Sequence, residues 1–107
     1  PWTLAKSFKG ACPIGPWLSL QDISSLDSLS LELVKNKQLA QKGQASDMIF
    51  KPQQLLEYVK KHYPIQAGDI ILTGTPEGVA ALKSGDLLTA RLQSENREIL
   101  ACHWDVI

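Results

Sequence analysis

Residues 29–43, LSLELVKNKQLAQKG, carry the clearest structural pattern in this chain. The leucines at 29, 31 and 33 alternate with a serine and a glutamate, and this period of two is typical of a β-strand with one buried face. Asn36-Lys37 fits a two-residue turn, because asparagine tolerates the left-handed backbone region that tight hairpins need. We therefore predict a hairpin whose second strand runs from about 38 to 42 and ends at Gly43.

One convincing helical pattern follows, at about 52–63. Pro52 suits the first helical position, where its missing N–H would have no partner. Apolar residues at 55, 56, 59 and 63 then form one stripe, and Pro64 ends the segment. We predict this as the only main helix.

The other apolar segments are short and favour strands. One is expected at about 3–8, and two more follow Gly-Asp pairs, at 70–72 and from residue 87 onward. A last hairpin is expected, with its turn near 94–97 and its return strand at about 99–106. Because most connections are too short for parallel crossovers, the pattern predicts an α+β fold that is mostly β.

The composition argues against several classes of partner. Eleven basic and eleven acidic residues cancel, so no basic surface for nucleic acid is expected. No apolar run is long enough to cross a membrane, and we expect no signal peptide. Cys12 and Cys102 lack the CxxC spacing of zinc sites, and the composition is not that of a disulfide scaffold. We expect two free thiols and a cytoplasmic location.

The stretch LTGTPEGV, residues 72–79, is the first candidate site. Gly74 allows a ligand to approach the backbone closely, and the hydroxyl of Thr75 can donate and accept hydrogen bonds. Pro76 would hold this loop rigid. Local chemistry leaves two interpretations open: a ligand-binding loop, or threonines that satisfy a tight turn.

Lys6 is the second candidate, because apolar neighbours surround it in sequence. A partly buried ammonium would need an anionic partner, which suits an anionic substrate. The alternative is an ordinary surface lysine. A Ser–Lys pair with Ser7 is not expected, since adjacent side chains on a strand at 3–8 point to opposite faces.

The remaining titratable residues favour structural roles. Asp69 and Asp86 lie in Gly-Asp turns, where a carboxylate commonly accepts hydrogen bonds from nearby backbone N–H groups. His62 and His103 are isolated from other metal-ligating side chains, which disfavours a metal site.

Three stretches together resemble the fumarylacetoacetate hydrolase family. They are AKSFKGACPIGPW (5–17), QKGQASDMIF (41–50) and AGDIILTGTPEGVAALKSGD (67–86), and the likeness extends over essentially the whole chain. It is greatest to the small single-domain members that act on acylpyruvates, oxaloacetate, hydroxyheptadienedioate and related dicarboxylic oxo-acids. The resemblance implies a mixed β-roll, a homodimer and a Mg²⁺ or Mn²⁺ ion that holds the substrate as an enolate.

The resemblance also implies roles for three residues. Lys6 would lie beside the metal site and interact with the substrate, which makes it the catalytic candidate. Thr75 would bind the substrate's carboxylate or carbonyl, and Gly74 would give access to the backbone. Gln41 and Glu77 are not assigned to the site.

The family's His-x-Glu-x-Glu motif and later aspartate, which hold the metal, have no counterpart in these residues. We therefore expect residues 1–107 to be the C-terminal portion of a catalytic domain, with the metal ligands outside this chain, and to be inactive alone. The implied reaction is hydrolysis, isomerisation or decarboxylation of a 2-oxo or 2,4-dioxo dicarboxylic acid. The alternative is a non-catalytic β module used for assembly or ligand binding.

Overall fold

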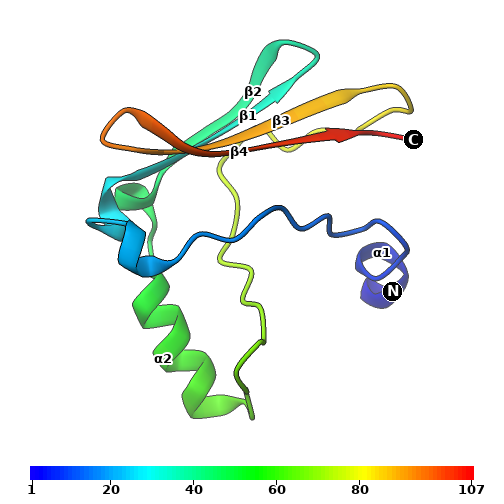
Figure 1. The fold of residues 1–107 in the computed structure, drawn as a ribbon. Helices are drawn as coiled ribbons and strands as arrows, with labels where there is room; N and C mark the ends of the chain where they lie inside the picture. The colour runs from blue at the N-terminus through cyan, green and yellow to red at the C-terminus, as the bar shows by residue number, and fades with distance from the viewer.

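The computed structural model describes residues 1–107 and contains one four-stranded antiparallel sheet (Figure 1). The sheet has the spatial order β2-β1-β3-β4. Its strands are β1 (Leu29–Lys35), β2 (Gln38–Gln44), β3 (Leu87–Ser94) and β4 (Arg97–Asp105). One main helix, α2 (Pro52–His62), accompanies the sheet. The expected α+β class, mostly β, is confirmed.

Both predicted hairpins are present, and each turns on two residues with positive φ. Asn36 (φ 49°) and Lys37 (φ 68°) connect β1 to β2, and Glu95 (φ 52°) and Asn96 (φ 63°) connect β3 to β4. Two consecutive positive φ values define the turn whose twist matches that of the flanking strands. The prediction from residues 29–43 is therefore confirmed in its strands and in its turn.

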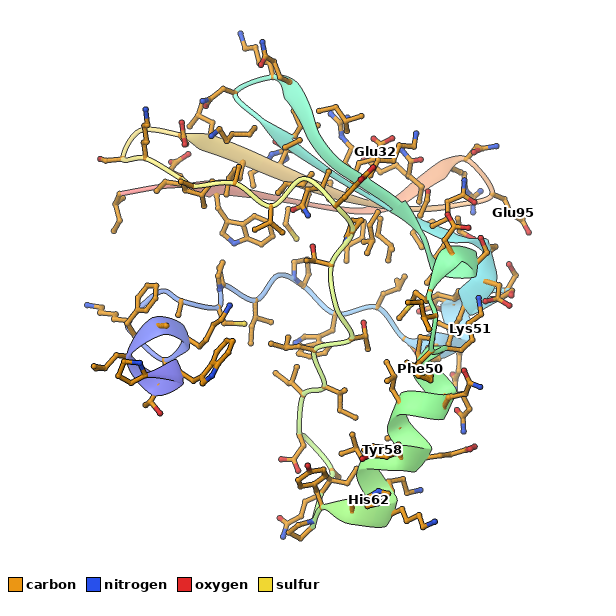
Figure 2. The ribbon with its side chains drawn as sticks, turned by 180° about the vertical axis from the view of Figure 1, so that it is seen from behind. Glu32, Phe50, Lys51, Tyr58, His62 and Glu95 are labelled. Carbon is orange, nitrogen blue, oxygen red and sulfur yellow. The ribbon has the colours of Figure 1, made fainter.

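Helix α2 begins at Pro52 and ends at His62, two residues before Pro64, close to the predicted bounds. Pro52 occupies the start of the helix, and the backbone N–H of Lys51 donates to Gln54 Oε1 at 2.8 Å. At the far end His62 stacks on Tyr58, with ring centroids 4.2 Å apart (Figure 2). Lys51 joins the helix to the sheet side of the molecule, because its Nζ donates to Ser46 O at 2.7 Å and pairs with Asp27 at 3.2 Å.

The two faces of the sheet differ in character. Leu31, Leu92 and Leu100 are paired neighbours across three strands, and they form an apolar row on the face toward α2 and the connecting segments (Figure 1). The opposite face carries charge: Glu32 pairs with Lys42 at 2.9 Å. The period-two pattern in β1 therefore divides an apolar face from a charged one.

Three short 3₁₀ helices and one short α-helix complete the elements: η1 (Leu20–Asp22), η2 (Leu26–Ser28), η3 (Ala45–Asp47) and α1 (Trp2–Lys6). The strand predicted at 3–8 is wrong, since α1 occupies that segment. No strand lies beside this segment in the sheet order, so its backbone bonds locally, with Ser7 N–H donating to Thr3 O at 2.8 Å. The argument that Lys6 and Ser7 point to opposite faces of a strand loses its premise.

The strand predicted at 70–72 is also wrong. Residues 70–82 make no backbone–backbone hydrogen bond. A β-strand requires hydrogen bonds to a neighbouring strand, and no strand of the chain pairs with residues 70–72. The second Gly-Asp unit differs because β1 and β4 flank β3 on both sides.

The chain encloses no hydrophobic core. Asp86 is its only buried residue. It exposes 8913 Å², whereas a folded monomer of 11.8 kDa exposes about 5900 Å². Its radius of gyration is 15.1 Å, against about 13 Å for a compact domain of this length. The apolar faces of the sheet, of α2 and of the N-terminal segment are therefore open. No helix is long and apolar enough to cross a membrane.

Candidate functional site

The candidate loop, residues 73–78, lies against the edge strand β2 and is fastened there by Gln41. The side-chain Nε2 of Gln41 donates to Thr75 Oγ1 at 3.0 Å and to Pro76 O at 2.7 Å. Gln41 pairs with Leu33 of β1, and its side chain is half-buried while Thr75 is exposed. One amide group thus holds two consecutive residues of the loop.

Two glycines let the loop come this close. A Cβ on Gly43 would lie 2.9 Å from Pro76 Cβ, so only glycine leaves room for the proline ring on β2. Gly74 has φ +112°, a backbone conformation that residues with a side chain rarely adopt. The first glycine allows close packing and the second allows the turn that leads into Thr75.

The backbone of this loop is open. Because residues 70–82 make no backbone–backbone hydrogen bond, the N–H groups of Gly74 and Thr75 have no backbone acceptor in the chain. Both residues are exposed. The loop therefore offers the hydroxyls of Thr73 and Thr75 and adjacent N–H donors, which suits the recognition of a carboxylate or carbonyl oxygen.

Gly74 and Thr75 form part of the lining of a cavity of about 560 Å³. Leu31 and Leu92 of the sheet line it, as do Phe50 and Leu55 near and on α2. Figure 2 shows Phe50 where the chain passes from the sheet to α2. Apolar walls with a few polar groups are typical of small-molecule sites. Its volume is within the usual range of such sites, roughly 300–1,000 Å³.

Lys6 lies elsewhere. It is the last residue of α1, at the free end of the N-terminal segment (Figure 1), and it does not line the cavity. Its side chain is exposed, with Nζ 5.9 Å from the centre of the Trp2 ring. Of the two interpretations of Lys6, a partly buried ammonium and an ordinary surface lysine, the second fits this exposed position, because α1 has few contacts with other elements. Gly74 and Thr75 are adjacent in the structure, but Lys6 is not brought to them.

Asp69 and Asp86 accept hydrogen bonds from nearby groups, as predicted for aspartates in Gly-Asp turns. Asp69 accepts a hydrogen bond of 2.8 Å from the N–H of Gln66. Asp86 accepts one of 2.9 Å from the N–H of Lys83 and one of 2.8 Å from the amide of Asn36. These two hydrogen bonds, followed by the charge of Lys35, hold the pKa of Asp86 below its usual value of 3.8.

Both histidines make local contacts, and both cysteines are free. His62 Nδ1 lies 2.8 Å from Tyr58 O, and His103 Nδ1 lies 3.0 Å from the hydroxyl of Thr89. Cys12 and Cys102 are free thiols, as predicted.

The residues present do not form a divalent-cation site. No group of three His, Cys, Asp or Glu side chains lies close enough together to hold an ion. Asp47 is the one carboxylate among the residues that line the cavity, whereas Mg²⁺ or Mn²⁺ needs several oxygen ligands at octahedral positions.

Gln41 is the site residue that sequence reasoning missed. No signal in the sequence indicates this role: a regular hairpin with its turn at 36–37 would pair Gln41 with Glu32, whereas the register shift between Leu33 and Val34 places it opposite Leu33 on the apolar face. A polar amide at such a position needs hydrogen-bond partners, and here the partners are Thr75 and Pro76.

Comparison with known proteins decides the family. The model of the fumarylacetoacetate (FAA) hydrolase C-terminal family matches residues 1–102. The chain belongs to the fumarylacetoacetate hydrolase family.

Relatives within this family are similar along almost the whole chain. The mitochondrial oxaloacetate tautomerase FAHD1 of Rattus norvegicus is 43% identical over 90 residues, which cover 84% of this chain and 41% of that protein. The crystal structure of yeast ynq8, a fumarylacetoacetate hydrolase family protein, superposes with a TM-score of 0.91 and 33% identity, over 98% of this chain and 46% of that one.

A third relative was solved with ligands. It is maleylpyruvate hydrolase from a Sphingobium species in complex with manganese(II) and pyruvate, with a TM-score of 0.81 and 28% identity, over 91% of this chain and 36% of that one. The chain thus spans less than half the length of the relatives it matches.

Proposed function

We propose that the protein carrying this chain is an isomerase, hydrolase or decarboxylase of the family, with a 2-oxo or 2,4-dioxo dicarboxylic acid as substrate. The observation that supports it is the loop at Gly74 and Thr75, held on β2 beside a cavity lined by apolar and polar residues. The relatives named for oxaloacetate and maleylpyruvate support the substrate class. In this proposal residues 1–107 are the C-terminal portion of the catalytic domain.

The loop supplies hydrogen-bond donors to the substrate. The hydroxyl of Thr75 donates to a carboxylate or carbonyl oxygen, and the neighbouring backbone N–H groups can bind a second oxygen. Donors fixed before the reaction stabilise negative charge that develops on such an oxygen, because they need no reorganisation when it forms. The apolar residues Phe50 and Leu55 orient the carbon chain.

Lys6 is proposed as the catalytic lysine, with its charge directed to the developing enolate. The cation at the end of α1 is exposed and unpaired with any carboxylate. Reaching the substrate requires the N-terminal segment to lie closer to the loop than it does in the isolated chain.

A Mg²⁺ or Mn²⁺ ion is part of the proposal for the whole protein, supported by the manganese–pyruvate complex of a relative. Residues 1–107 do not form its site, so we derive no step through it. A homodimer and a cytoplasmic location are further proposals; the rat relative is named mitochondrial.

A non-catalytic module is the second candidate. Two observations favour it: Lys6 lies apart from the Thr75 loop, and no cation-binding cluster is present. Such a module would use its open apolar faces for assembly, and the cavity would bind a ligand without turnover.

The test is an assay of the full-length protein on two substrate types. Oxaloacetate keto–enol exchange and cleavage of an acylpyruvate are followed by ultraviolet absorbance, with Mg²⁺ and then with a chelator. Turnover of either substrate that stops with the chelator supports the enzyme. Binding of these acids without turnover favours the module.

A further inference from the structure

Gln41 fixes the direction of the hydrogen bond at Thr75. Its Nε2 lies 2.7 Å from Pro76 O, and a backbone carbonyl can only accept. The group next to Pro76 must therefore be the NH₂ end of the amide. The same nitrogen lies 3.0 Å from Thr75 Oγ1, so its second hydrogen is directed to the threonine oxygen.

This arrangement leaves the proton of Thr75 free. A hydroxyl has one hydrogen to donate and two lone pairs that accept. The bond from Gln41 uses a lone pair, and it is the only hydrogen bond of the Thr75 side chain in the structure. The O–H of this exposed side chain then donates away from β2.

We propose that Gln41 is a positioning residue that orients Thr75 to donate its hydroxyl proton toward the ligand. This inference rests on the proposed function for the identity of the ligand. A donor oriented in this way favours ligands that present an acceptor oxygen, such as a carboxylate or an enolate.

The close packing of the loop on β2 supports a positioning role for the Gln41 amide. Gly43 leaves room for Pro76, and Gly78 lies against the backbone of Ala40 and the side chain of Gln41, where a Cβ would collide. Two glycines thus allow the loop to lie on β2 on both sides of the amide.

The first experiment needs no ligand. Methyl NMR of Thr75 is recorded in the full-length protein for wild type, Gln41→Met and the control Gln38→Met. Methionine matches glutamine in size but has no amide donor, and Gln38 lies exposed on the same strand. We expect a shifted, broadened Thr75 signal in Gln41→Met only. An unchanged signal would overturn the positioning role.

The second experiment measures binding of oxalate, an unreactive dianion similar to a 2-oxo acid, by calorimetry with Mg²⁺ present. Gln41→Met and Thr75→Val are each expected to weaken binding about tenfold, as for a lost hydrogen bond to a charged group. Gln41→Glu should weaken it at least as much, because a carboxylate would accept the threonine proton.

A double-mutant cycle separates positioning from a general loss of structure. If Gln41 acts through Thr75, adding Gln41→Met to Thr75→Val changes affinity by less than about twofold. Two full, additive losses would overturn the inference. If wild type binds no oxalate while the methyl signal still depends on Gln41, the proposed function is wrong and the positioning role stands.

Discussion

The side-chain amide of Asn36 donates a hydrogen bond of 2.8 Å to the carboxylate of Asp86, which is the only buried residue of the chain. The side-chain carbonyl oxygen of Asn36 accepts a hydrogen bond of 2.9 Å from the N–H of Leu87. The turn of the first hairpin is thereby fastened to the start of β3. Lys35 adds an ion pair of 3.5 Å to the same carboxylate.

Replacing Asn36 should loosen this end of the sheet. Asn36→Gly tolerates the positive φ but removes both side-chain hydrogen bonds, which we expect to lower the free energy of unfolding by roughly 1–2 kcal/mol. Asn36→Ala should lower it further, since alanine is strained at φ 49°. Urea unfolding of the full-length protein measures both. Equal stability of wild type and Asn36→Gly would contradict this account.

The lowered pKa of Asp86 makes part of the stability depend on pH. Because its pKa is lower when folded than when unfolded, the charged carboxylate stabilises the fold above 3.8, its usual value. That contribution is lost as the pH falls through the folded pKa. We expect Asp86→Asn to be less stable than wild type near pH 6, and the difference to shrink toward about pH 2. A constant difference across this range would show that the charge is not the cause.

The parts of the fold that local rules govern could be predicted from the sequence. The first hairpin depends on leucine alternation and on an asparagine turn, and α2 depends on a proline start and an apolar stripe. The strands expected at 3–8 and 70–72 fail for a different reason. Strand formation needs a neighbour to bond with, and the local sequence does not state whether that neighbour is present.

The same distinction, between local sequence effects and contacts with distant segments, applies to the candidate site. Gly74 and Thr75 are among the residues that line the cavity, and the turn that they form depends on local chemistry; their role in binding substrate stays a prediction. The apolar neighbours of Lys6 in sequence do not determine whether it is buried, and in the structure α1 has few contacts with other elements and leaves it exposed. Gln41 was missed because its role depends on a contact with Pro76, 35 positions away.

Lys6→Ala tests the catalytic role of the lysine. In the full-length protein we expect a loss of roughly 2–4 kcal/mol in transition-state stabilisation, by analogy with removal of one donor to a developing oxyanion. Thermal stability is measured alongside, so that a loss of transition-state stabilisation is separated from a loss of folded protein. Lys9→Ala, three residues along the same exposed segment, is the control. An unchanged kcat/KM would show that Lys6 is an ordinary surface lysine with no catalytic role.

Residues 1–107 expressed alone should associate. The chain exposes about 3000 Å² more than a folded monomer of its mass, including Trp2 at 80% and Leu72 at 78% exposure. An excess of this size is typical of surfaces that are covered in stable assemblies. Sedimentation velocity should find oligomers or aggregates. A single monomeric species at micromolar concentration would contradict the expectation.

The most direct test of the account is the catalytic efficiency of Thr75→Val on oxaloacetate keto–enol exchange. Valine keeps the shape of threonine and removes the hydroxyl that Gln41 directs toward the ligand. We expect kcat/KM to fall about 100-fold, the lower range for loss of one preorganised donor, with unchanged thermal stability. Thr75→Ser, which keeps the hydroxyl, should retain most activity. A wild-type rate in Thr75→Val would contradict the central claim that this loop binds the reacting oxo-acid.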